Sequence, residues 1–206
     1  MTYTLYYAPG ACSISPHTAL REAGLPFELS RVDLGKKTYE DGAKNYLDVN
    51  PKGYVPALRV PDGRVITENL VMIQYIADQV PEKKLAPAPE SGWDRLRFAE
   101  LLVFISTELH KGLGPLYNPK ANDELKAAVK GRLVTRFGYL ASVVGEKKYL
   151  LGDDFSVADG YAFYCLRGWK TVAKEPFPGD VLPGYYARLL ARPSIQAVLA
   201  AEKIEG

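Results

Sequence analysis

The sequence has few of the residues that mark specialised classes of protein. Its 206 residues include only two cysteines, Cys12 and Cys165, and two histidines, His17 and His110. Two cysteines so far apart argue against a disulfide framework and are typical of a cytoplasmic protein with reduced thiols. No group of cysteine and histidine has the spacing of metal ligands, so we expect no metal.

An excess of charge of one sign is also missing, as are long apolar runs. The 26 basic and 24 acidic residues give a formal net charge of +2, which makes no electrostatic case for a nucleic-acid partner. No apolar run is long enough to span a membrane, and the first residues lack the pattern of a signal peptide. We therefore expect a cytoplasmic protein that does not bind membranes.

The N-terminal part alternates strand and helix patterns. Strand patterns at 2–7 and 27–34 flank a helical pattern at 15–24, and so short a β-α-β unit indicates parallel pairing. Residues 57–67 contain an Asp62-Gly63 step between two apolar runs, which is typical of a hairpin. A helical pattern over 68–80 follows.

The composition changes at Pro81, where a segment with three prolines begins. Strand patterns nearly vanish after it, and the longest helical patterns span 93–110, 123–144 and 156–169, with shorter ones at 185–191 and 194–202. The sequence thus predicts an α/β domain over 1–81, a linker over 82–89 and an all-α domain over 90–206.

Cys12 follows a Pro-Gly turn at the end of the first predicted strand. Ser13 or Ser15 can cap the helix that comes next, with Pro16 in its first turn. A thiol there faces backbone N–H groups and the positive end of the helix dipole, and both favour the thiolate. The alternative is a small buried apolar residue, and this segment alone does not decide between them.

The order of domains and motifs resembles that of the glutathione transferases. The segment 50–58 resembles the one that ends in the family's cis-proline, Thr67-Glu68-Asn69 resembles its acidic-plus-hydroxyl motif, and 156–159 resembles its helical capping box. The segments 8–13 and 107–112 are similar to signatures of the bacterial beta class, whose active-site residue is a cysteine. The resemblance implies a thioredoxin-like first domain and an all-helical second domain.

The resemblance also implies where glutathione, as co-substrate and without a further cofactor, would bind. If the Val55-Pro56 bond is cis, the backbone of Val55 can pair with the cysteinyl part of glutathione. The start of the helix at Asn69 would hold the γ-glutamyl carboxylate, Glu68 its amino group, and Cys12 would face its sulfur. An ordinary trans proline and simple helix capping are the alternatives.

Four further residues complete the expected glutathione-binding set. Lys37 matches a beta-class lysine that contacts the glycyl carboxylate, although from sequence alone a solvated loop lysine is the better interpretation. Thr107, His110 and Lys111 lie where a long predicted helix ends. The resemblance brings His110 to the thiol as a second catalytic residue beside Cys12, and both cations also suit the negative end of their own helix dipole.

Two departures from the family pattern keep two hypotheses open. Asn69 replaces the usual serine, and Val103 stands where the beta class often has an asparagine. The first hypothesis is an enzyme that conjugates glutathione to electrophilic, largely apolar molecules in detoxification. The second is a non-catalytic protein of the same fold that binds glutathione or apolar ligands.

Cys12 adds a second chemistry to the enzyme hypothesis. Ser15 takes the place of the second cysteine of a C-x-x-C motif, so exchange with glutathione disulfides would use a single thiol. Cys165 lies in an apolar helical run and is interpreted as core. The resemblance implies a homodimer. Candidates to line an electrophile site are Tyr7, Ser13, Phe104, Tyr117, Tyr164 and Trp169, although aromatic residues at such spacing are more often core.

Overall fold

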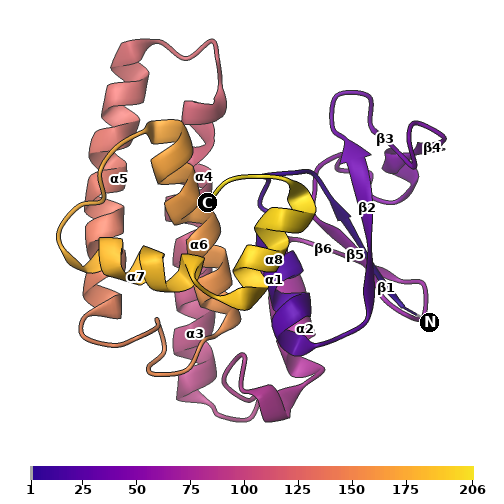
Figure 1. Cartoon of the computed structure of the whole chain (residues 1–206), viewed down its shortest axis with the longest axis horizontal. Helices are drawn as coiled ribbons and strands as arrows, with labels where there is room; N and C mark the ends of the chain where they lie inside the picture. The colour runs from indigo at the N-terminus through magenta and orange to yellow at the C-terminus, as the bar shows by residue number, and fades with distance from the viewer. Residues whose placement is uncertain (1) are drawn as a thin grey trace. The chain divides into compact units, whose positions relative to one another are not determined.

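The computed structural model describes residues 2–206, which form two compact units (Figure 1). The first unit contains the chain up to Leu85 together with Pro193–Gly206, and the second contains Ala86–Arg192. The sequence assigned everything after residue 90 to the helical domain, whereas the structure groups the C-terminal helix with the first unit. The reason is that this helix packs against the first helix of the chain.

A six-stranded sheet with the order β4-β3-β2-β1-β5-β6 forms the scaffold of the first unit. The strands are β1 Tyr3–Tyr7, β2 Phe27–Asp33, β3 Thr38–Tyr39, β4 Lys44–Asn45, β5 Ala57–Arg59 and β6 Val65–Thr67. β1 and β2 are parallel, as the sequence predicted, and the remaining pairs are antiparallel. β5 and β6 form the predicted hairpin, in which Asp62 Oδ1 accepts a hydrogen bond from the N–H of Arg64 at 3.0 Å.

The described part of the first unit has three α-helices, α1 Ile14–Ala23, α2 Asn69–Asp78 and α8 Pro193–Glu202, besides the 3-10 helices η1 Tyr46–Asp48 and η2 Pro81–Lys83. α1 ends at the predicted Gly24, which has a φ of 67° that glycine adopts without strain. α1 packs against both α2 and α8, and Figure 1 shows the yellow α8 beside the indigo α1. The last helix of the chain thus supports the helix that follows Cys12.

Three tyrosines pack together in the core of the first unit, next to the segment that contains Val55. Tyr6 of β1 contacts Tyr39 edge-on at 5.3 Å and Tyr46 at 5.8 Å between ring centroids. Tyr46 lies in a 3-10 helix, Tyr46–Asp48, and all three rings are buried. Val55 belongs to the same cluster, so the chain segment around Pro56 rests on a packed aromatic layer.

The second unit is built from helices. They are α3 Trp93–Phe104, the π-helical η3 Ile105–His110, α4 Lys111–Leu113, the 3-10 helix η4 Gly114–Tyr117, α5 Asp123–Val144, α6 Val157–Gly168, the π-helical η5 Trp169–Ala173 and α7 Val181–Leu190. α6 begins with the predicted capping box of Ser156 and Asp159. The thioredoxin-like sheet in one unit and the helices in the other confirm the predicted fold class.

Two helices differ from their sequence-based expectation. The helix predicted over 93–110 does not end at His110, because it changes to π geometry at Ile105 and then continues into α4. α4 ends at Leu113, so His110 and Lys111 lie within about one turn of the end of the α-helical part, and their interaction with the negative end of the helix dipole stays a prediction. α7 begins at Val181, earlier than predicted, because Pro183 falls in its first turn, where proline is tolerated.

Candidate functional site

Cys12 lies in the turn between β1 and α1, two positions before the first helical residue. Ser13 closes this turn: its Oγ donates to Ala8 O at 3.2 Å and accepts from Ala8 N at 3.4 Å. The expected side-chain cap is therefore wrong, since Ser13 bonds back to the turn and α1 has no side-chain cap. The positive end of the α1 dipole nevertheless lies beside the thiol.

The Val55-Pro56 peptide bond is cis, as the resemblance implied. Cys12 Sγ donates to Val55 O at 3.5 Å, which places the thiol against the backbone predicted to hold glutathione. Val55 follows Tyr54, whose carbonyl accepts from Tyr46 Oη at 3.0 Å and from Asn50 Nδ2 at 2.6 Å. The buried side chains of Tyr46 and Asn50 thus hold the backbone just before Val55 in place.

Asn69 joins α2 to the same turn. Its Nδ2 donates to Cys12 O at 3.3 Å. Because a carbonyl only accepts, the nitrogen of the amide must face Cys12. Oδ1 is then buried with no hydrogen-bond partner among residues 2–206. An unpaired buried acceptor is costly, and Asn69 carries this cost while its amide nitrogen secures the turn at Cys12.

Glu68 precedes α2 with a φ of 71°, a left-handed conformation that is rare for a residue other than glycine. Such strain clusters at binding sites. Its exposed carboxylate accepts from Lys52 Nζ at 2.5 Å and from Tyr54 Oη at 2.8 Å. The hydrogen bond to Glu68 raises the pKa of Lys52 and that of Tyr54. A ligand ammonium at Glu68 would therefore join two donors already present.

Lys37 lies in the loop after β2 and holds another part of the first unit. It has a φ of 57°, and its half-buried side chain donates from Nζ to Gly53 O at 2.6 Å. Gly53 precedes Tyr54, so Lys37 secures the start of the segment that leads to Val55. Contact of Lys37 with a ligand carboxylate stays a prediction.

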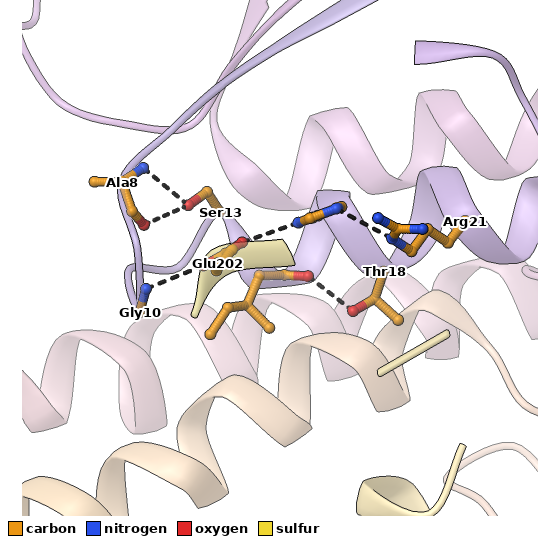
Figure 2. A network of polar contacts seen from close by, with 8 residues as sticks. Ala8, Gly10, Ser13, Thr18, Arg21 and Glu202 are labelled. Carbon is orange, nitrogen blue, oxygen red and sulfur yellow. Dashed lines mark hydrogen bonds and ion pairs between the residues drawn. The ribbon is translucent and has the colours of Figure 1, made fainter. Parts of the chain in front are cut away.

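A buried network anchors the turn before Cys12 to α8 (Figure 2). Glu202 Oε2 accepts from the N–H of Gly10 at 3.0 Å, and Oε1 accepts from His17 Nδ1 at 2.9 Å. Arg21 Nε donates to His17 Nε2 at 3.1 Å. Arginine only donates and a carboxylate only accepts, so His17 carries its proton on Nδ1.

His110 belongs to the second unit and is half-buried. Its Nδ1 lies 2.8 Å from Tyr161 Oη, and its ring meets that of Tyr164 edge-on at 4.9 Å between centroids. Burial, and to a smaller extent the charge of Lys111, lower the pKa of His110 to about 4. The imidazole is therefore neutral at neutral pH.

The other predicted residues of the second unit differ in exposure. Thr107 is exposed and donates from Oγ1 to Val103 O at 3.0 Å, and Lys111 is exposed. Tyr164 and Trp169 are buried, and Trp169 Nε1 donates to Pro176 O at 2.9 Å. In the first unit Ser13 is also buried. Three of the residues predicted to line an electrophile site reach the surface. Tyr7 and Phe104 are half-buried, and Tyr117 is exposed.

A cavity of about 580 Å³ opens beside this arrangement, between the Ala8-Pro9 turn and the ends of β2 and β3. None of the residues predicted to bind glutathione line it. Among residues 2–206 there is no cluster of His, Cys, Asp or Glu that could hold a metal. Within the same range, none of the helices combines the length and apolarity needed to cross a membrane.

Sequence reasoning missed the residues that support the site. Tyr54 and Lys52 lie within the recognised segment 50–58, but they are 14 and 16 residues from Glu68, so their contact with it carried no local signal. Glu202 and Tyr161 carried no signal, because Glu202 lies 192 residues from Gly10 and Tyr161 lies 51 residues from His110. Only the fold reveals such pairs.

The comparisons with known proteins agree with this geometry. The family model of the glutathione S-transferase N-terminal domain matches residues 11–79, and that of the C-terminal domain matches residues 107–202. The curated glutathione S-transferase GstA of Escherichia coli O157:H7 is 40% identical over 202 residues, covering 98% of this chain and 99% of the relative.

Solved structures extend the likeness to the fold. The ternary complex of BphK, a bacterial GST, shares 48% identity with a TM-score of 0.91, covering 98% of this chain and all of the other. Two sphingomonad enzymes each share 39% identity with a TM-score of 0.89 and the same coverage. One is complexed with glutathione, and the other, from Sphingomonas chungbukensis, is described as bacterial beta class.

The thiol at the start of α1, the cis-proline and the two matched domains define the class of protein. The chain belongs to the glutathione transferase family and is an enzyme of its bacterial beta class.

Proposed function

We propose that the first unit binds glutathione with its sulfur at Cys12. The observation that carries this proposal is the convergence of three groups: the Cys12 thiol on Val55 O, the backbone of Val55 beside a cis-proline, and the Asn69 side chain, which donates to Cys12 O. The sphingomonad relative with bound glutathione supports the ligand. The backbone of Val55 beside the cis-proline suits a peptide-like molecule.

The charged residues fit the two ends of glutathione. Glu68 would accept the γ-glutamyl ammonium while keeping Tyr54 as a donor, and the first N–H groups of α2 beside Asn69 would face the neighbouring carboxylate. Lys37 would exchange Gly53 O for the glycyl carboxylate. His110, Thr107 and Lys111 of the second unit complete the proposed set.

The first proposed reaction is conjugation. Glutathione loses its thiol proton to water, and its thiolate forms a C–S bond with an electrophilic carbon. In a substitution the leaving group departs with its bonding electrons. In an addition the π bond at that carbon breaks, and its electron pair takes up a proton from water. Stabilising the thiolate by one pKa unit needs about 1.4 kcal/mol. The positive end of α1 supplies part of that stabilisation, because the ligand sulfur would lie beside Cys12. Electrophilic, largely apolar molecules are the proposed substrates, and detoxification is the proposed role.

The second proposed reaction is thiol–disulfide exchange through one cysteine. The Cys12 thiolate attacks a glutathione mixed disulfide, forms a disulfide with glutathione and expels the other thiolate. A second glutathione thiolate then attacks this disulfide, restores Cys12 and leaves as oxidised glutathione. Ser15, which holds the place of a resolving cysteine, cannot close an intramolecular cycle.

Replacing Cys12 with alanine separates the two reactions. We expect Cys12→Ala to abolish disulfide reductase activity and to keep conjugation of glutathione to a chlorinated aromatic acceptor. Cys165→Ala is the matched control, since that thiol is fully buried in α6, and the melting temperatures of both variants establish that they fold. If both activities of Cys12→Ala match those of the parent protein, the site is assigned wrongly.

Asn69 and Val103 motivate the second candidate, a binding protein without turnover. Both replace side chains that the beta class usually has at these positions, so contacts used for catalysis would be lost while the ligand site stays. Glutathione affinity by calorimetry, measured beside conjugation and reductase assays, distinguishes the candidates. Binding without either activity would favour this second function.

We also infer a cytoplasmic homodimer. The cytoplasm keeps a thiol such as that of Cys12 reduced. Trp93, Leu96 and Val103 follow one face of α3 at helical spacing, with exposed fractions of 66%, 60% and 48%. Large exposed apolar residues in one row are typical of an interface, and a second copy of the chain is the proposed partner.

A further inference from the structure

His110 owes its direction to an irregularity in its helix. It is the last residue of the π-helical segment Ile105–His110. A π turn bonds residue i to i+5, one residue further than an α turn, and each residue turns a helix by about 100°. The segment thus rotates His110 away from the phase of α3. In its new direction the imidazole meets Tyr161 of α6.

The surroundings hold the ring in one orientation. Tyr161 and Tyr164 both meet it edge-on, with centroids at 5.7 and 4.9 Å and interplanar angles of 76° and 84°. Tyr161 is only 1% exposed, and it lies two residues after Asp159, which fixes the start of α6 through four hydrogen bonds. The Tyr161 hydroxyl that contacts His110 Nδ1 is therefore held in a fixed position.

The chemistry of the two partners gives the hydrogen bond a direction. The ring is neutral, since its pKa is lowered to about 4, and a neutral imidazole has one N–H and one acceptor nitrogen. The acceptor nitrogen of imidazole is more basic than a phenol oxygen, and a phenol O–H is a good donor. The favoured bond therefore runs from Tyr161 Oη to Nδ1, which leaves the proton of the ring on Nε2.

We propose that Tyr161 is a positioning residue that holds His110 with its proton on Nε2, so that His110 offers glutathione a hydrogen-bond donor and not a base. Among residues 2–206, Nε2 has no hydrogen-bond partner. Its N–H is thus available to stabilise a thiolate or a carboxylate. That glutathione is the acceptor of this hydrogen bond rests on the proposed function, whereas the position of the proton on the His110 ring does not.

The two histidines of the chain make the proton directly observable. Histidine labelled with ¹⁵N gives two sets of ring signals in a long-range ¹H–¹⁵N spectrum of the ligand-free protein. We expect His110 to carry its proton on Nε2 at neutral pH, and His17, between Arg21 and Glu202, to carry it on Nδ1. A His110→Gln spectrum assigns the signals. A proton on Nδ1 of His110 would overturn the proposal.

Tyr161→Phe tests whether the Tyr161 hydroxyl keeps the ring proton of His110 on Nε2. Without that donor, Nδ1 loses its hydrogen bond, and we expect the signals of His110 to shift toward a mixture of both tautomers. Tyr164→Phe is the matched control, because it keeps the edge-on ring and the Tyr161 hydroxyl, and we expect the tautomer to be unchanged. An unchanged tautomer in a folded Tyr161→Phe protein would mean that Tyr161 does not position His110.

Kinetics distinguish a donor from a base. The amide N–H of glutamine reaches the position of Nε2 but takes no proton. We therefore expect His110→Leu to lower kcat/KM for glutathione by about 10- to 100-fold, and His110→Gln to restore most of that loss. Equal losses in both variants would show a base and contradict the proposal. If the parent protein neither binds nor uses glutathione, the proposed function fails while the spectra still decide the tautomer.

Discussion

Glu202 is a buried carboxylate whose two oxygens serve different partners, Gly10 and His17. In Glu202→Gln one oxygen becomes an amide nitrogen, so one buried donor faces another donor. An unsatisfied buried group costs about 1–3 kcal/mol, and we expect the free energy of unfolding in urea to fall by about that amount. Glu146→Gln, on an exposed side chain, is the control. Equal stability of the two variants would mean that the network contributes nothing.

His110 links stability to pH. Its folded pKa of about 4 lies below the value of about 6.5 expected in the unfolded chain. Between these values the unfolded state binds a proton that the folded state does not, so stability decreases as the pH falls from about 6.5 to about 4, by about 3 kcal/mol at most. The partly exposed ring reduces that figure.

The variant His110→Gln removes this contribution. Unfolding free energies of the parent and His110→Gln proteins, measured across this pH range, should therefore diverge, with the parent losing more stability toward acid. Parallel curves would contradict the lowered pKa. The carboxylates titrate in both proteins and cancel in the comparison.

At this scale, the sequence could predict residues whose motif is local. The turn at Cys12 was found from its own chemistry, whereas the cis-proline and the role of Glu68-Asn69 were implied by the resemblance of short segments to family motifs. The supports of these residues were not found. Glu202, Tyr161 and Asn50 act through contacts that depend on packing, and a buried glutamate or tyrosine has no local pattern that separates it from any other.

At the scale of elements, the start of α6 is held by four hydrogen bonds that the Asp159 carboxylate accepts. Asp159 accepts from the backbone N–H groups of Leu150 at 2.9 Å and Ser156 at 2.8 Å, from Ser156 Oγ at 2.7 Å and from Tyr185 Oη at 2.6 Å. Ser156→Ala removes one of these donors and should lower stability by about 1 kcal/mol. Asp159→Ala leaves several buried donors unpaired and should cost more, about 3 kcal/mol or above.

Thermal unfolding of the two variants tests this order, and refolding rates show whether the box also acts early. We expect both variants to refold more slowly than the parent protein. A Ser156→Ala protein less stable than Asp159→Ala would contradict the assignment of Asp159 as the shared acceptor. Asp153, an exposed carboxylate just before α6, provides the control substitution, Asp153→Ala.

Elements with a long apolar period were predictable, whereas short or irregular ones were not. α5, with five buried residues along one face, appeared within its predicted bounds. β3 and β4 have two residues each, too few for an alternation to show. The change from α3 to π geometry at Ile105 left the apolar pattern recognisable, so nothing in that pattern indicated the rotation that directs His110.

For the whole molecule, the proposed dimer offers the clearest test. Leu96→Arg places a charge in the exposed apolar row of α3, and desolvating it at an interface would be costly. We expect sedimentation to change from a dimer to a monomer. Leu125→Arg, at an exposed leucine near the start of α5, should leave the dimer intact. A parent protein that sediments as a monomer would refute the interface outright.

The division of the chain between its two units was only partly predictable. The Pro-rich segment marked the passage from sheet to helices near Leu85. The return of Pro193–Gly206 to the first unit had no counterpart in the composition, because α8 is another apolar helix like those before it. What distinguishes α8 is the buried Glu202, and its partners lie at the opposite end of the sequence.

This closure of the chain on itself has a consequence for synthesis. Gly10 and Glu202 are separated by 192 residues, and at 5–20 residues per second a ribosome needs about 10 to 40 s to make that distance. Throughout this interval the nascent chain carries Cys12 in a turn that lacks its anchor. The thiol therefore leaves the ribosome well before the carboxylate that orders its surroundings.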